Sequence, residues 1–279
     1  MALKLMYITN NEDVARIAEG NGVDWIFVDL EINGKEERQG HLDTVISRHR
    51  IDDVEKVKKV LDKSELLVRV NPIYDDSKYE IDKVINDGAD IVMLPYFKTK
   101  DEVKTFVDYV DGRAKTCLLW ETKGAMENID EILSLDGIDL IHIGLNDLHL
   151  EYEMDFMFEL LADGTVEILC NKFKEKGIPY GFGGIAQLGE GELAAEHIMA
   201  EHYRLGSQMA ILSRSFCNIN KTNNVNTIKD VFAKGMREIR NYEKELQEKD
   251  DSFFDDNKKT VNDKVMKIKN IISKKSTRD

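Results

Sequence analysis

The sequence predicts an α/β fold of the (β/α)8 type, a TIM barrel followed by a C-terminal helical extension. Apolar runs of strand length alternate with amphipathic runs of helical period from residue 3 to residue 213. There are eight strand-like runs, which is the number that a closed (β/α)8 barrel needs. Glycines, which commonly end helices, stand just before several of these runs, namely Gly22, Gly88, Gly137, Gly177 and Gly206.

Each of the alternating runs can be assigned to an element. The predicted strands cover residues 3–9, 25–30, 66–70, 91–95, 116–121, 140–145, 180–184 and 209–213. The predicted helices cover residues 14–20, with Asn11 as a cap, and residues 54–61, 79–86, 102–110, 126–135, 155–176 and 194–204. Helical crossovers make consecutive strands parallel, so their carboxyl ends should fall at the same end of the sheet.

Two parts of the chain depart from this alternation. Residues 33–50 form a polar loop far longer than a usual strand-to-helix connection, which is typical of a functional loop or a lid. Beyond residue 216, a charged helix is predicted over 228–246, and residues 249–279 combine an acidic patch with a lysine-rich helix. We therefore expect a barrel domain over residues 1–220 and a helical extension over 221–279. The last helix could pack on the barrel or on another subunit, and a basic tail that binds an anionic partner is an alternative.

Composition narrows the class of protein. The 279 residues are 42% hydrophobic, enough for one large core, and the formal net charge is −14. An acidic chain without a basic face is repelled by nucleic acid and by anionic membranes, so neither is expected as a partner. The sequence contains no apolar run of transmembrane length and no recognisable signal peptide at its start, which favours a cytoplasmic protein. Three scattered cysteines, Cys117, Cys170 and Cys217, are interpreted as core residues.

Two acids mark the predicted functional end of the sheet. Glu121 ends the strand over 116–121 and Asp147 follows the strand over 140–145, with one helical crossover between them. Parallel strands place both acids at the same sheet end, where paired carboxylates can bind a divalent cation together with water and substrate. Either acid alone could instead cap the following helix.

Other polar residues also fall at the ends of the predicted strands. They are Asp29, Glu31, Arg69, Asn71, Tyr96, Thr122, Asn146, Gly183, Gly184, Ser213 and Arg214. Four acids at one mouth repel each other unless cations lie among them, and a metal together with Arg69 would supply that charge. Gly184, Ser213 and Arg214 suggest a pocket for a second anionic group of the substrate, of the kind that barrels build from their last two loops. Pairing of Arg214 with a neighbouring acid is an equally open reading.

Several segments resemble the HpcH/HpaI aldolase and citrate lyase family. These segments are VDWIFVDLE, LLVRVN, DKVINDGADIVMLPYFKTKDE, WETKGAMENIDEI and GIDLIHIGLNDL, and the resemblance runs from about Gly22 to Phe216. It implies a class II, metal-dependent pyruvate aldolase, in which Glu121 and Asp147 bind Mg²⁺ or Mn²⁺ and Arg69 contacts the ketone oxygen. It also implies that amides around Gly144 and Asn146 hold the substrate carboxylate, and that Asp29 and Glu31 orient metal-bound water.

The implied reaction is the cleavage or formation of a 2-oxo acid through a pyruvate enolate. The implied partners are small molecules, a 2-oxo acid or pyruvate together with an aldehyde, and the resemblance also implies a homo-oligomer.

One position departs from the aldolase pattern. The aldolase branch has a proton-transferring histidine directly after the glutamate that matches Glu31, and here Ile32 stands in that place. His41 or His149 could substitute for it, although a surface or supporting position is the simpler reading for either. The departure keeps two alternatives open: an acyl-coenzyme A lyase of the citrate lyase β or malyl-coenzyme A type, and a catalytically inactive barrel that binds an anionic metabolite.

Overall fold

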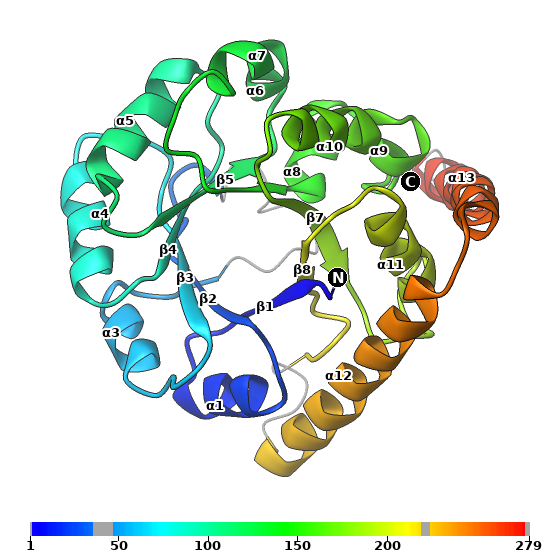
Figure 1. The fold of residues 1–279 in the computed structure, drawn as a ribbon, viewed down its shortest axis with the longest axis horizontal. Helices are drawn as coiled ribbons and strands as arrows, with labels where there is room; N and C mark the ends of the chain where they lie inside the picture. Colours follow the sequence, from blue (N-terminus) through cyan, green and yellow to red (C-terminus); the bar gives the residue numbers. More distant parts are fainter. Residues whose placement is uncertain (1, 36–46, 219–223, 277–279) are drawn as a thin grey trace. The chain divides into compact units, whose positions relative to one another are not determined.

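The computed structural model describes residues 2–35, 47–218 and 224–276, and it has the predicted fold (Figure 1). Eight strands form a closed parallel barrel in chain order. They are β1 Lys4–Ile8, β2 Trp25–Asp29, β3 Glu65–Arg69, β4 Ile91–Leu94, β5 Lys115–Trp120, β6 Leu140–Ile143, β7 Tyr180–Ile185 and β8 Met209–Leu212. The predicted TIM barrel is therefore confirmed. His41 lies outside the described residues.

The chain divides into two compact units, residues 5–142 and residues 1–4 with 143–279. In the first unit, β1 to β5 pair in chain order, and the register sets Asp29 of β2 opposite Arg69 of β3. Its helices are α1 Glu12–Gly20, α3 Asp52–Lys58, α4 Ser77–Asn86, α5 Lys100–Val110, α6 Lys123–Glu127 and α7 Ile129–Ile132. The predicted cap of the first helix is confirmed, because the Asn11 side chain accepts hydrogen bonds from the amides of Asp13 and Val14.

In the second unit β7 pairs with β8. Its helices are α8 Leu145–Glu151, α9 Glu159–Ala162, α10 Thr165–Glu175, α11 Ala195–Arg204, α12 Val225–Gln247 and α13 Asp251–Ser276. Helix α8 was not predicted, because the apolar run that forms β6 continues into it: the strand ends at Ile143, and the helix starts two residues later.

Two predicted helices are broken in the structure. The helix predicted over 126–135 is α6 followed by α7, with Asn128 between them donating a side-chain hydrogen bond to the Gly124 carbonyl at 2.9 Å. The helix predicted over 155–176 is α9 followed by α10. There the Asp163 side chain accepts a hydrogen bond from the Thr165 amide at 2.8 Å, and Gly164 has a φ of +88°, a conformation that ends a right-handed helix.

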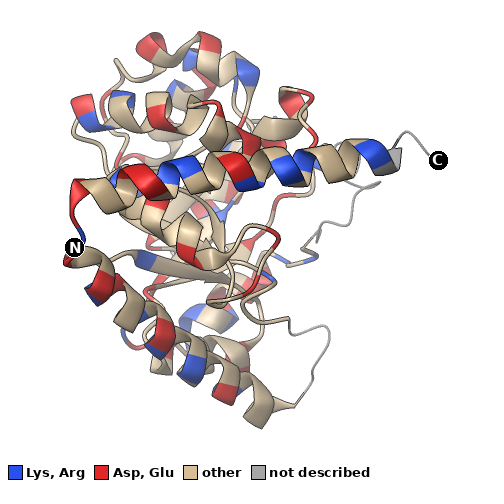
Figure 2. Cartoon of the chain, turned by 90° about the vertical axis from the view of Figure 1, so that its right-hand side faces the viewer, with Lys and Arg blue, Asp and Glu red and all other residues tan. Residues whose placement is uncertain are grey.

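The last helix packs on its own chain. Helix α13 lies against α9 and α11, where Val261 and Val265 are buried and Lys269 pairs with Glu159 at 2.5 Å. Figure 2 shows acidic and lysine positions interspersed in the first half of α13, whereas the charged positions of its second half are lysines. All three cysteines are buried thiols, as predicted. In the described ranges, no helix combines the length and the hydropathy needed to cross a bilayer.

Candidate active site

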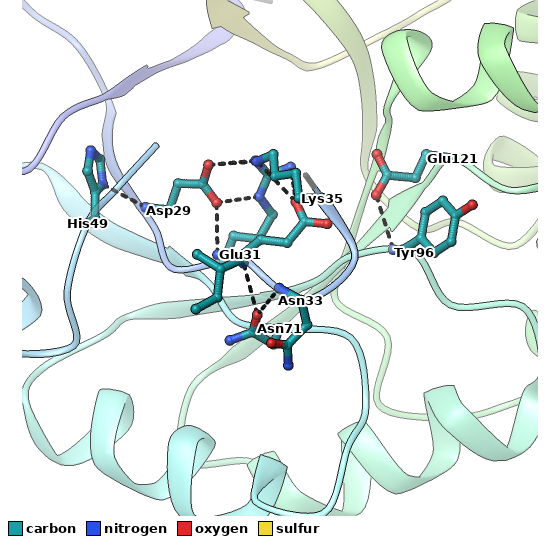
Figure 3. Close-up of polar contacts among 10 residues, drawn as sticks. Asp29, Glu31, Asn33, Lys35, His49, Asn71, Tyr96 and Glu121 are labelled. Carbon is teal, nitrogen blue, oxygen red and sulfur yellow. Dashed lines mark hydrogen bonds and ion pairs between the residues drawn. The ribbon is translucent and has the colours of Figure 1, made fainter. Parts of the chain in front are cut away.

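Four charged side chains meet where β2 and β3 end, and we call them the charge cluster: Asp29, Glu31, Lys35 and Arg69. Figure 3 shows Asp29, Glu31 and Lys35 pointing toward one another. Arg69 donates to both oxygens of Asp29, from Nε to Oδ1 and from Nη2 to Oδ2, each at 2.8 Å. The Lys35 Nζ lies 3.0 Å from Asp29 Oδ2 and 3.2 Å from Glu31 Oε2. Arg69 Nη1 is 3.3 Å from the same Glu31 oxygen. The structure thus brings the three predicted residues together and adds Lys35.

Three members of the charge cluster are buried, and the charges of the four members balance. Asp29 is 1% exposed, Glu31 0% and Lys35 3%, and the two carboxylates face two cations. Burial alone would raise the pKa of Asp29, but the charges and hydrogen bonds of Arg69 and Lys35 outweigh it and hold that pKa well below its usual range. Asp29 therefore stays ionised near neutral pH. A carboxylate this acidic is a poor proton acceptor.

Electrostatic attraction keeps Arg69 charged in this buried setting. Burial opposes the charge, but Asp29, Glu31 and Glu121 together raise the pKa of the guanidinium above its usual range. The effect of Glu121 matters for the site, because it connects a predicted metal ligand at the end of β5 with the charge cluster at the ends of β2 and β3.

The turn after β2 is pinned by Asn71. Its Oδ1 accepts hydrogen bonds from the amides of Ile32 at 2.9 Å and Asn33 at 3.0 Å, while its Nδ2 donates to Glu80 Oε1 at 2.7 Å. These bonds fix the backbone that leads into Lys35. The Ile32 side chain is 57% exposed, so the position that departs from the aldolase pattern contributes no polar group to the charge cluster.

The His49 ring contacts the backbone of Asp29. Its Nδ1 accepts a hydrogen bond from the Asp29 amide at 3.0 Å (Figure 3). The segment around it is anchored by Asp53, whose Oδ2 accepts from the Arg50 amide at 2.9 Å and from Asn10 Nδ2 at 2.8 Å. Because Nδ1 is an acceptor here, the ring proton of neutral His49 is on Nε2. Burial lowers the pKa of His49, which favours this neutral form.

We expect His49 to remain neutral at pH values where an exposed histidine becomes protonated. Nitrogen-detected NMR should show the Nε2–H tautomer and a titration midpoint below about 6.5, the ordinary histidine value. The folded state binds this proton less readily than the unfolded state, so the contribution of His49 to stability is complete above about pH 6.5 and is lost as the pH falls below it. The variant His49→Gln assigns the signal. A midpoint at or above the ordinary value would contradict this geometry.

Glu121, the first predicted metal ligand, is held at the end of β5. It is 2% exposed, and its Oε1 accepts a hydrogen bond from the Tyr96 amide at 3.1 Å. Tyr96 has a φ of +49°, an unusual value for a non-glycine residue. The amide that donates to Glu121 therefore belongs to a residue in the left-handed conformation. The neighbouring Thr122 caps α6, accepting from the Ala125 amide at 3.0 Å.

The remaining predicted residues belong to the second unit. Gly144 is the N-cap of α8, Asn146 and Asp147 lie in its first turn, and Asp147 is 4% exposed. Gly184 of β7 lies beside Ser213, since a Cβ at Gly184 would be 3.4 Å from the Ser213 Cβ. Arg214 is exposed. His149 is buried, and its Nδ1 is 3.1 Å from the carbonyl of Leu145 in its own helix.

The donor chemistry of the two predicted ligands suits Mg²⁺ or Mn²⁺. Glu121 and Asp147 are buried carboxylates, and Mg²⁺ is commonly bound by one or two carboxylates while substrate and water complete its shell. Within the described ranges there is no group of three or more histidine, cysteine or acidic side chains arranged to hold a metal.

Comparison with known proteins identifies the family. Residues 4–155, which include the charge cluster, Glu121 and Asp147, match the family described as HpcH/HpaI aldolase/citrate lyase. The chain belongs to this family. A curated relative of this HpcH/HpaI chain is the hydroxypyruvate/pyruvate aldolase of Sagittula stellata, which is 28% identical over 167 residues. That match covers 49% of the chain and 59% of the relative's length.

Solved structures of similar fold include other HpcH/HpaI proteins. An HpcH/HpaI aldolase from Desulfitobacterium hafniense superposes with a TM-score of 0.58 at 18% identity, covering 82% of this chain and 93% of that one. A family protein from Burkholderia cenocepacia gives 0.60 at 13% identity, with coverage of 82% and 95%. The citrate synthase SbnG gives 0.60 at 15% identity, with coverage of 82% and 94%. At these identities the likeness concerns the fold.

Two residues of this HpcH/HpaI site escaped the sequence analysis. Lys35 follows the dipeptide Asn33–Gly34, a turn signal that could have indicated that the chain folds back on the end of β2. His49 lies near the end of the long polar loop, and nothing local in the sequence ties it to Asp29.

Proposed function

We propose that this chain is a divalent-metal-dependent, aldolase-type carbon–carbon lyase that cleaves or forms a 2-oxo acid through a pyruvate enolate. The observation that carries the proposal is Arg69, whose side chain is 12% exposed, is clamped by Asp29 and is attracted by Glu121. A fixed guanidinium beside a metal-binding carboxylate is suited to an enolate oxygen, on which negative charge develops. The family match and the pyruvate aldolase named among its relatives support the same chemistry.

Each site residue would have its own role in the reaction. Glu121 and Asp147 would hold Mg²⁺ or Mn²⁺, since the carboxyl ends of the strands share one rim in a parallel barrel. The bound ion would supply electron withdrawal from the ketone. Arg69 would donate to the ketone oxygen and stabilise the enolate, with Asp29 and Glu31 holding the guanidinium in place. Backbone amides at Gly144 and Asn146 would orient the carboxylate of the substrate.

Gly184, Ser213 and Arg214 would receive a second anionic group. The small-molecule partners would be a 2-oxo acid, or pyruvate and an aldehyde, and we retain a homo-oligomer in the cytoplasm as part of the proposal. The division into a barrel domain over residues 1–220 and an extension over 221–279 is likewise retained.

The runner-up is an acyl-coenzyme A lyase of the citrate lyase β or malyl-coenzyme A type. The observation that favours it is the exposed Ile32 at the place where the aldolase branch carries a histidine. The third alternative is not an enzyme but an inactive barrel that binds an anionic metabolite. It stays open for the same reason, the isoleucine at position 32.

Proton exchange of pyruvate distinguishes these functions. The purified chain with Mn²⁺ in deuterated buffer is expected to replace the methyl protons of pyruvate with deuterium, as followed by proton NMR, and EDTA should stop the exchange. Cleavage of malyl or citramalyl thioesters without pyruvate exchange would favour the acyl-coenzyme A lyase. Binding of Mn²⁺ and pyruvate with neither reaction would favour the inactive barrel.

A further inference from the structure

Lys35 occupies a position that a lysine rarely takes. Among the described residues it is the one lysine that is buried, with 3% of its surface exposed. Burying an ammonium group is costly unless carboxylates surround it, and its Nζ lies within 3.2 Å of both Asp29 and Glu31. The backbone that carries it is fixed as well, by the two amides that Asn71 binds and by the left-handed turn at Gly34, with a φ of +73°. The placement is therefore built into the structure.

We propose that Lys35 is a positioning residue of the active site, which holds Asp29 and Glu31 in place so that the Arg69 guanidinium keeps its orientation toward the substrate ketone. This inference rests on the proposed function, because it assigns Arg69 to the ketone. Lys35 acts through its neighbours, and the reacting atoms do not need to touch it.

The balance of charges explains why Lys35 is needed in addition to Arg69. With Lys35 present, two positive charges face two negative charges. Removing Lys35 takes one positive charge away, while Arg69 Nη1 remains 3.3 Å from Glu31 Oε2. The carboxylate would then draw closer to that nitrogen and compete with the substrate for its donors. Lys35 prevents this by pairing with the same Glu31 oxygen at 3.2 Å.

Other charged groups adjoin the charge cluster without replacing Lys35. His49 contacts Asp29 through the backbone amide and is neutral, so it adds no compensating charge. Glu121 carries a negative charge, which raises the pKa of Arg69 further. Neither group can supply the positive charge that a Lys35 variant would lose.

The test compares four variants in the Mn²⁺-dependent exchange of pyruvate. Lys35→Met should lower kcat by about 10- to 100-fold, the size expected when a catalytic group is displaced by about 1 Å. Lys35→Arg should recover part of the rate. Lys35→Met combined with Glu31→Gln restores the charge balance and should be faster than Lys35→Met alone. Lys59→Met is the matched control, because it removes an exposed lysine paired with Glu55 at 2.7 Å, and its kcat should equal that of the wild type.

The outcomes separate this inference from the proposed function. A wild-type kcat and KM in Lys35→Met, or a loss that Glu31→Gln does not reverse, would overturn the positioning role. If the wild type itself shows no exchange, the proposed function fails, and thermal midpoints then decide about Lys35. Recovery of the midpoint in the double variant supports the coupling of Lys35 to Glu31, while a midpoint at or below that of Lys35→Met overturns it.

Discussion

Glu121→Gln and Asp147→Asn should each abolish tight Mn²⁺ binding and lower the rate of pyruvate exchange by about 1,000-fold. A divalent ion beside a ketone stabilises a developing enolate by several kcal/mol, and a loss of about 4 kcal/mol corresponds to this factor. Both substitutions replace a carboxylate with an amide of nearly the same shape. The side-chain carbonyl that Glu121→Gln introduces can still accept the amide hydrogen of Tyr96, so the local structure should persist. Calorimetric titration with Mn²⁺ measures the binding directly, before any assay of activity.

The control for these two variants is Asp108→Asn, which changes an exposed acid paired with Lys104. It should bind Mn²⁺ as the wild type does. Retained metal binding in either Glu121→Gln or Asp147→Asn would remove that residue from the ligand set. Global unfolding of either variant would instead mark the acid as structural.

The largest loss of stability is expected from Asp29→Asn. The variant leaves Arg69 and Lys35 without their shared counter-charge in a buried site, and its amide group turns hydrogen-bond donors toward the donors of those residues. Breaking a buried pair in this way costs about 3–5 kcal/mol. Urea unfolding at pH 7 measures the loss. Asp256→Asn, which removes an exposed partner of Lys259, should cause a much smaller change because solvent screens that pair.

The same variant predicts a pH dependence with a definite sign. The pKa of Asp29 is lower in the folded state than in the unfolded state, so its stabilising contribution is present above about pH 4, the ordinary aspartate value, and is lost as the pH falls below it. The difference in stability between wild type and Asp29→Asn should therefore be complete at pH 7 and shrink in acid. A difference that is equal at pH 7 and pH 3 would show that Asp29 acts through shape and not through charge.

Sequence reasoning predicted the barrel and much of the charge cluster for one physical reason. Strand register in a parallel sheet is regular, so an aspartate and an arginine at the ends of β2 and β3 are placed side by side once the strands are recognised. Lys35 and His49 reach Asp29 from irregular backbone, which is fixed by the side chains of Asn71 and Asp53. Periodicity carries no information about such contacts. The break at Gly164 was missed because the apolar spacing continues across it.

The conformation of Tyr96 has a consequence for the choice of residue at that place. A left-handed φ costs a non-glycine residue roughly 1–2 kcal/mol, a cost that glycine avoids. The Lys98 ammonium lies 5.0 Å from the centre of the Tyr96 ring, and the Tyr96 amide donates to Glu121 Oε1. This one strained residue therefore contacts an ammonium group through its ring and a carboxylate of another loop through its backbone.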